Sequence, residues 1–239
     1  MPNDIQAVLF DLDGTLLRVQ MAEFIPRYIA GLATQCREFV SPKQFEKAML
    51  SAIRSLIRFT GNGELTNEQR LFILLQQQLG VAEVDLRQGF DAYRDSGMSE
   101  LQPLVHSIPL AKQVLAECSG QVPLVLATNP VFPEFMIRAR LEWADLDGLH
   151  FEHLTSYENS CFCKPQSGYF EAIAERLGVA AEHCLMVGND TQHDLSAAAV
   201  GMQTFLVDTW LIDRQGVDWP CEHRGNHVHL RQFLQERLG

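Results

Sequence analysis

Five short apolar runs, each followed by polar residues, constrain the fold of this chain more than any other feature. Apolar runs of about four to eight residues that stop at turn-forming residues are typical of buried strands. The clearest run stops at Asp11, directly before a turn that contains a glycine. The five runs cover residues 5–10, 122–127, 150–155, 184–187 and 203–207.

Segments with a helical spacing of apolar residues separate these predicted strands. They cover residues 110–118, 134–143, 169–177 and 194–200, and a glycine follows each of the last two. Strands that alternate with helices indicate a parallel sheet with helices on both faces. In such sheets, ligands bind beyond the carboxyl ends of the strands. We therefore expect the polar clusters that follow the strands to meet in one crevice.

Residues 18–104 interrupt this alternation. Four segments there carry helix-spaced apolar residues, and no strand is predicted among them. The sequence therefore predicts an α/β fold with a Rossmann-like parallel-sheet core, made of residues 1–17 and 105–239, and an inserted all-helical cap domain, made of residues 18–104. The four helical segments of the cap cover residues 21–39, 42–59, 67–79 and 84–93.

The composition disfavours several classes of partner and location. The net charge of −11 opposes binding to nucleic acid and to anionic membrane surfaces. No apolar run reaches the length that a transmembrane helix needs, about 18 residues, and residues 1–4 do not resemble the start of a signal peptide. Six cysteines without a secretory signal indicate reduced thiols. We therefore expect a cytoplasmic protein with neither a nucleic-acid nor a membrane partner.

The strongest chemical motif is Asp11-Leu12-Asp13-Gly14-Thr15, directly after the first predicted strand. Residues two apart on an extended backbone share a face, so the two carboxylates should lie together. One of them could bind a metal and attack phosphorus while the other handles a proton. The alternative is an acidic turn without chemistry, because Asp and Gly favour turns in any case.

Three weaker motifs follow later strands. Thr128 and Asn129 could hold a phosphate oxygen through a hydroxyl group and turn amides, although strands often end in such residues. Lys164 precedes a proline, which disfavours a helical conformation, and could neutralise clustered carboxylates; a lone lysine is otherwise a surface residue. Asp190 and Asp194 follow a glycine and could both lie near a helix N-terminus, where one of them would be only a cap.

In their order, spacing and placement at strand ends, the four motifs resemble those of the haloacid dehalogenase-like hydrolase superfamily. The position of the insert resembles members with a helical first-type cap. The resemblance implies that Asp11 is the nucleophile, that Asp13 is the acid and base, and that Lys164 orients Asp11. It further implies that Thr128, Asn129 and Lys164 bind the phosphoryl group. The implied cofactor is Mg²⁺, held by Asp11, the main-chain carbonyl of Asp13, and Asp190.

The fourth motif departs from the commonest form of the family. Asn189 occupies the position where that form has an aspartate, and the acid stands one residue later, at Asp190. We therefore favour Asp190 as the metal ligand, with Asp194 in support. The choice among these three residues stays open at this point.

The resemblance predicts a Mg²⁺-dependent phosphohydrolase that cleaves a small-molecule phosphomonoester through an aspartyl-phosphate. A phosphomutase of the β-phosphoglucomutase type is the alternative, and a non-catalytic phosphate- or partner-binding module is a third reading. Asp13 favours turnover, because transport ATPases of the superfamily have Thr there and its dehalogenases lack the acid. We expect the cap to close over the site, with Arg18, Met21 and Phe24 facing a small phosphorylated metabolite. The identity of the substrate and the oligomeric state stay open.

Overall fold

A computed structural model describes residues 5–96 and 98–238 of the chain. The expectation about a signal peptide concerns residues 1–4, which lie outside the described residues. Within the described ranges, none of the helices combines the length and apolar character needed to cross a membrane.

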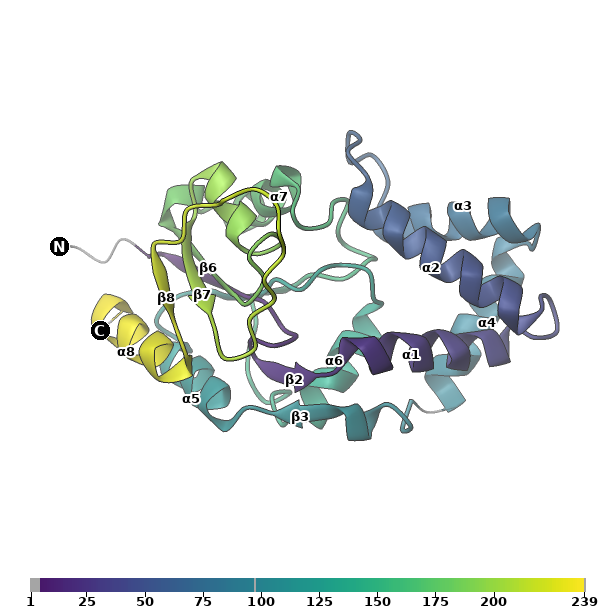
Figure 1. Ribbon diagram of the computed structural model, residues 1–239, viewed down its shortest axis with the longest axis horizontal. Helices are drawn as coiled ribbons and strands as arrows, with labels where there is room; N and C mark the ends of the chain where they lie inside the picture. The colour runs from purple at the N-terminus through teal and green to yellow at the C-terminus, as the bar shows by residue number, and fades with distance from the viewer. Residues whose placement is uncertain (1–4, 97, 239) are drawn as a thin grey trace.

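A six-stranded sheet forms the centre of the larger lobe (Figure 1), and all of its strand pairs are parallel. The predicted α/β class is thus confirmed. The order across the sheet is β5-β4-β1-β6-β7-β8. Val8 lies opposite Leu124 on one side and Leu185 on the other, so the first strand is central. The strands are β1 (Ala7–Phe10), β4 (Leu124–Leu126), β5 (His153–Leu154), β6 (Cys184–Gly188), β7 (Gln203–Val207) and β8 (His223–Gly225).

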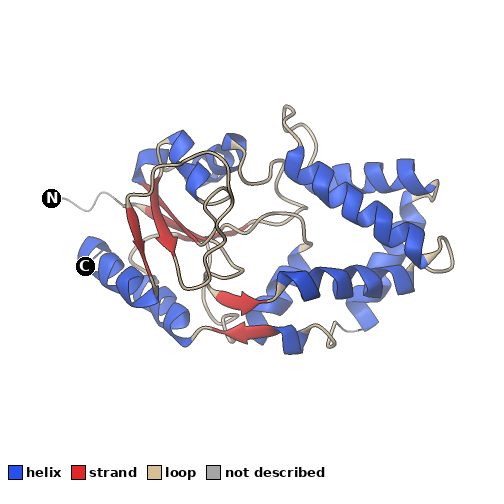
Figure 2. Ribbon diagram, in the orientation of Figure 1, coloured by secondary structure: helices blue, strands red, loops and turns tan. Residues whose placement is uncertain are grey.

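Helices cover both faces of this sheet (Figure 2). Successive side chains of a strand point to opposite faces, and both faces of β1 are buried. Ala7 and Leu9 pack in the cluster that includes Phe170, whereas Val8 and Phe10 pack in the main core. This explains why β1 is a continuous apolar run rather than an alternating one. The helices are α5 (Pro109–Cys118), α6 (Glu134–Trp143), α7 (Ser167–Leu177) and α8 (His227–Leu238), with short 3₁₀ helices η1 (Gln102–Leu104), η2 (Ala181–His183) and η3 (Leu195–Val200).

The helical insert lies at the end of the molecule opposite β8 and α8 (Figure 1). Its third helix begins with a capping box, in which Thr66 and Gln69 satisfy each other's backbone N–H groups. Glycine at residue 80, with φ of 68°, ends this helix in the left-handed conformation. The helices of the insert are α1 (Met21–Gln35), α2 (Pro42–Arg58), α3 (Asn67–Leu79) and α4 (Glu83–Ser96).

Two short antiparallel strands, β2 (Leu17–Val19) and β3 (Val105–Ser107), join the insert to the core. The prediction that no strand lies in residues 18–104 was therefore wrong at its first residues. Three-residue strands are too short to show a periodic pattern, which is why the sequence did not reveal them. The predicted α-helix at residues 194–200 is instead the 3₁₀ helix η3.

The insert also contacts the core at the start of α3. Asn67 is fully buried, and its backbone N–H donates to the carbonyl of Ser160 at 2.8 Å. Its side-chain amide donates to the carbonyl of Pro130 at 3.2 Å. The next backbone N–H, of Glu68, donates to Tyr157 at 2.8 Å. These bonds hold the insert at a point distant from the β2–β3 ribbon, so it is not attached by the ribbon alone.

Candidate active site

The first motif forms a tight turn at the carboxyl end of β1. The backbone N–H of Asp11 still bonds to the carbonyl of Val187 on the neighbouring strand, at 2.8 Å. Gly14 then takes a φ of 90°, and its N–H donates to Leu17 at 2.7 Å. A Cβ at this position would lie 2.1 Å from Nδ2 of Asn189, so only glycine lets the fourth motif approach the turn.

Lys164 connects the first, third and fourth motifs. Its ammonium group donates to Oδ1 of Asp11 at 2.8 Å and to Oδ1 of Asp194 at 2.6 Å, and all three side chains are buried. Burial raises the pKa of Asp11 to about 7; the charge of Lys164 opposes this, while the carboxylates of Asp194 and Asp13 add to it. Although burial alone would lower the pKa of Lys164, Asp11 and Asp194 raise it above its ordinary value, so the lysine stays charged.

Asp13 pairs with an arginine that the sequence analysis did not single out. Nη1 of Arg140, on α6, donates to both carboxylate oxygens of Asp13, at 2.8 and 2.7 Å. Burial raises the pKa of Asp13, and the charges of Arg140 and Lys164 oppose that rise. The site therefore contains two charge-assisted pairs, one on each aspartate of the first motif.

The second motif is fixed through its backbone. The carbonyl of Thr128 accepts hydrogen bonds from the hydroxyl groups of Thr155 at 2.7 Å and Tyr169 at 2.8 Å. Asn129 donates through Nδ2 to the carbonyl of Lys164 at 3.4 Å, and its buried Oδ1 has no partner within residues 5–96 and 98–238. The structure thus brings the second and third motifs together, with an acceptor on Asn129 still available.

The fourth motif places its two acids differently. Asp194 bonds to Lys164, and its Oδ2 accepts the backbone N–H groups of Asn189 and Asp190, each at 2.9 Å. Oδ1 of Asp190 accepts two N–H groups of its own turn, and Oδ2 accepts Nε of Arg214 at 2.6 Å. Burial would raise the pKa of Asp190, but the bonds from His193 and Arg214 lower it. Asp190 thus faces Arg214, whereas Asp194 faces Lys164.

The charges of the cluster are suited to a cation. The carboxylates of Asp11, Asp13 and Asp194 outnumber the two cations, Lys164 and Arg140. Burial is the main cause of the raised pKa of Asp11, and the neighbouring carboxylates add to it. Within the part of the chain that the structure describes, no group of three or more His, Cys, Asp and Glu side chains is arranged to hold a metal ion. A metal beside Asp11 would therefore need main-chain or amide oxygens as well, which are hard donors of the kind that Mg²⁺ prefers.

Two further residues support the site from distant elements, and the sequence analysis gave no sign of either role. Nε2 of His227, at the start of α8, donates to the carbonyl of Thr15 at 2.7 Å. Burial lowers the pKa of His227, so the ring is neutral and holds the first turn by a neutral hydrogen bond. Tyr169, on α7, holds Thr128 as described above. Both contacts join residues far apart in the sequence, which periodicity cannot indicate.

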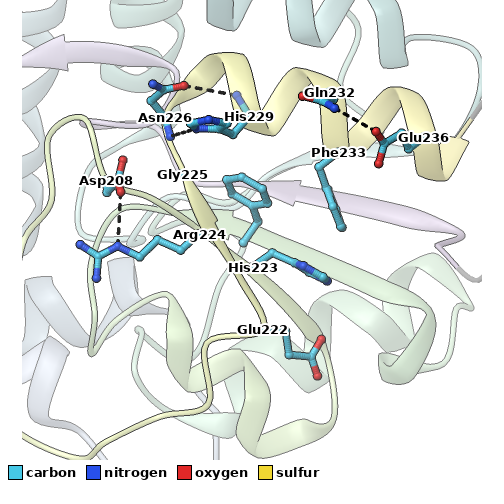
Figure 3. Close-up of a pocket in the computed structure, with 11 residues that line it drawn as sticks. Asp208, Glu222, His223, Arg224, Gly225, Asn226, His229, Gln232, Phe233 and Glu236 are labelled. Atoms are coloured by element: carbon cyan, nitrogen blue, oxygen red, sulfur yellow. Dashed lines mark hydrogen bonds and ion pairs between the residues drawn. The ribbon is translucent and has the colours of Figure 1, made fainter.

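A cavity of about 610 Å³ opens elsewhere, between β8 and α8 (Figure 3). Several of its polar groups bond to one another. Arg224 donates to Asp208 at 3.3 Å, and the backbone N–H of Asn226 donates to His229 at 3.3 Å. The lining includes none of the residues of the four motifs. We therefore assign the chemistry to the cluster around Asp11.

The chain resembles known proteins in sequence and in fold. The family model of haloacid dehalogenase-like hydrolases matches residues 5–201. The ribulose-1,5-bisphosphate 5-phosphatase of Halopiger xanaduensis is 30% identical over 213 residues, which are 84% of each chain. The crystal structure of a HAD phosphatase from Thermococcus onnurineus matches 98% of this chain and 100% of its own, with a TM-score of 0.60 and 19% identity. The L-2-haloacid dehalogenase RSc1362 matches 97% and 99%, with a TM-score of 0.59 and 19% identity.

Proposed function

The chain belongs to the haloacid dehalogenase-like hydrolases, and from this premise we propose that it is a phosphatase of a small phosphorylated metabolite. The observation that carries the proposal is the buried carboxylate of Asp11 at the carboxyl end of β1, with Lys164 on one oxygen and Asp13 two residues further on. The similarity to a protein named as a phosphatase supports the same class of substrate.

The proposed reaction has two steps. In the first, an oxygen of Asp11 attacks phosphorus, the bond from phosphorus to the leaving oxygen breaks, and Asp13 gives its proton to that oxygen. An aspartyl-phosphate and a free alcohol result. In the second, Asp13 takes a proton from water while the water oxygen bonds to phosphorus and the bond to Asp11 breaks. Phosphate leaves, and both aspartates return to their starting states.

The remaining motif residues bind and orient the phosphoryl group in this proposal. Lys164 holds Asp11 in place and offsets the negative charge of the transition state. Thr128 and Asn129 contribute a hydroxyl group and an amide beside Lys164. Tyr169 keeps the carbonyl of Thr128 fixed, so the strand end does not shift when the phosphoryl group binds.

We propose that Mg²⁺ is the cofactor, held by the carboxylate of Asp11, the main-chain carbonyl of Asp13 and the side-chain oxygen of Asn189. Asn189 fits this role better than Asp190, because its side chain lies against the Gly14 turn whereas Asp190 faces Arg214. When bound, the ion would offset the surplus negative charge and polarise the phosphoryl oxygens. Asp194 supports this arrangement through Lys164 and through the backbone of residues 189 and 190.

We assign residues 18–104 the role of a cap that shields the phosphoryl group from bulk water. Exclusion of water strengthens charge interactions such as those around Asp11. Phe24 of α1 is fully buried, and its ring centroid lies 6.0 Å from that of Phe132 in the core. Its side chain therefore packs between the insert and the core and is not exposed to a substrate. Because Asn67 also binds the core, closing would be a small adjustment and not a free swing about the ribbon.

A panel of phosphorylated metabolites tests the proposed function directly. We expect phosphate release from a small phosphomonoester that requires Mg²⁺ and stops on chelation, with kcat/KM well above that for a 5′-phosphorylated oligonucleotide. The same assay with added sugar phosphates separates a phosphatase from a phosphomutase, in which the phosphoryl group would pass to the sugar instead of to water. Absence of turnover on the whole panel would favour a binding module.

Variants of the fourth motif test the proposed metal ligand. We expect Asn189→Ala to raise the Mg²⁺ concentration for half-maximal activity by about tenfold or more, because a ligand is lost. Asp190→Asn should raise it much less, because that carboxylate serves Arg214 and its own turn. Titration of activity with Mg²⁺ in both purified variants gives the ranking. The opposite ranking would return the ligand position to Asp190, the residue that the sequence favours.

A further inference from the structure

Arg140 is a fully buried cation on α6. Its side chain has no exposed surface, and Nη1 binds both oxygens of Asp13, a residue 127 positions earlier in the chain. The side chain of Asp13 is 17% exposed, so the pair has its cation inside the protein and its anion nearer the surface. The contact therefore joins the interior of α6 to the proposed acid and base.

The burial of this guanidinium group is unfavourable by itself. Nε and Nη2 of Arg140 lie inside the protein without a hydrogen-bond partner among the described residues. Each unsatisfied buried donor costs about 1–3 kcal/mol. The group stacks near Phe132, at 4.7 Å, and Phe24, at 5.6 Å, which recovers only part of that cost. A methionine of similar length would fill the same space without buried donors, so the arginine is explained by its contact with Asp13 and not by the space that it fills.

The geometry explains the arginine by its effect on the orientation of the Asp13 carboxylate. One nitrogen bonded to both oxygens fixes the position and the plane of the carboxylate. If one oxygen carries a proton, the other still accepts from Arg140, so the orientation is kept in both protonation states. The aromatic rings of Phe24 and Phe132 pack against the guanidinium group and limit its movement, so it offers Asp13 a fixed donor.

We propose that Arg140 is a positioning residue that holds the carboxyl group of Asp13 where it can give a proton to the leaving oxygen of the substrate. This inference rests on the proposed role of Asp13 as the acid. Arg140 itself contacts no reacting atom, and its effect passes through Asp13. Proton donation by Asp13 matters most for a strongly basic leaving group, such as an alkoxide. It matters least for 4-nitrophenolate, a weakly basic anion that leaves without a proton.

The leaving-group dependence of kcat/KM tests this inference. This parameter covers the steps up to release of the alcohol, so it is independent of the later hydrolysis of the aspartyl-phosphate. The substrates are 4-nitrophenyl phosphate and the alkyl phosphomonoester that the purified, Mg²⁺-loaded enzyme uses best. The variants are Arg140→Met, Arg140→Lys, Asp13→Asn, and Asp13→Asn combined with Arg140→Met. Arg138→Met, on the exposed side of the same helix, is the matched control.

We expect Arg140→Met to lower kcat/KM for the alkyl substrate by about 10²-fold and for 4-nitrophenyl phosphate by less than about tenfold. Arg140→Lys should keep the same selectivity with a smaller loss. In the Asp13→Asn background, Arg140→Met should add little further loss, because the residue through which it acts is already disabled. Arg138→Met should behave as the parent enzyme on both substrates.

Four results would overturn the inference. Equal losses on the two substrates in both Arg140 variants would show a general structural role, and thermal unfolding of each variant identifies a folding defect. A further large loss in the Asp13→Asn background would show that Arg140 does not act through Asp13. An increased rate in Arg140→Met would show that the arginine restrains Asp13. If Asp13→Asn alone lost no selectivity, the proposed acid itself would be wrong and the inference would fall with it.

Discussion

The Asp11→Asn variant is expected to lose turnover of every phosphomonoester by about 10⁴-fold or more. An amide cannot form the bond to phosphorus, and the change also removes a proposed ligand of Mg²⁺. The residual rate should not rise with additional Mg²⁺, because the missing nucleophile limits it. Phosphate release by the purified variant, followed over hours at high enzyme concentration, measures the remaining activity.

Asp208→Asn is the matched control for this experiment. Asp208 also follows a sheet strand directly, but it pairs with Arg224 beside the cavity at the β8 edge. The control should keep near-parental activity, and both variants should keep the parental circular dichroism spectrum. Parental turnover in Asp11→Asn would place the nucleophile on another residue and remove the basis of the proposed mechanism.

Lys164→Met is expected to reduce both stability and activity. The substitution leaves Asp11 and Asp194 facing each other in the interior without their shared cation. Removal of one partner from a buried ion pair costs about 3–5 kcal/mol in free energy of unfolding. Activity should fall by about 10²–10³-fold, since a preorganised positive charge at the phosphoryl group is lost. Urea unfolding with a chelator present measures the stability.

The loss of stability in Lys164→Met should depend on pH. The pKa of Asp11 is about 7 in the folded protein and 3.8 without burial, so the folded state keeps a proton that the unfolded state releases between these values. Its contribution to stability is complete below pH 3.8 and is lost as the pH rises through 7. The charge of Lys164 lowers this pKa, so the pKa of Asp11 rises further in the variant. The stability of the variant therefore continues to fall above pH 7. The deficit against the parent should be largest above pH 7 and smallest near pH 4.

Lys112→Met provides the comparison, because Lys112 pairs with Asp145 at the surface. A surface pair contributes about 0–1 kcal/mol, so the control should lose little stability at any pH. A deficit in Lys164→Met that stayed constant between pH 4 and 8 would indicate lost packing instead of uncompensated carboxylates.

Much of the fold could be predicted because the core elements carry strong periodic patterns. The predicted bounds of α3, α6 and β7 are those that the structure shows. The strands β2, β3 and β8 have three residues each, which is too few for an alternating pattern. The helix α8 was missed because its sequence mixes polar and apolar residues without a clear stripe, as the segment from His227 to Leu230 illustrates.

The candidate site was predictable as far as strand topology determines it. Parallel strands end at the same edge of a sheet, so the motifs that follow β1 and β6 were expected to meet, and Lys164 does bond to both Asp11 and Asp194. The direction of a side chain within a turn has no such general rule. This is why the register of Asn189 and Asp190 could not be read from the sequence. Arg140 resembles any surface arginine of an amphipathic helix until its neighbours are known.

The contact at Asn67 limits how this enzyme could be re-engineered. A cap that covers the substrate is an attractive unit to exchange between related enzymes when the aim is to change the substrate. Here the start of α3 satisfies carbonyl groups of residues 157 and 160, in the loop that leads to Lys164. A transplanted cap whose helix did not begin at this place would leave those carbonyls without their backbone donors. A cap without an equivalent of Asn67 would also leave the carbonyl of Pro130 without its side-chain donor. The loop that carries the lysine would lose its support, so a graft intended to change the substrate would also weaken the proposed catalytic centre unless α3 stayed with the core.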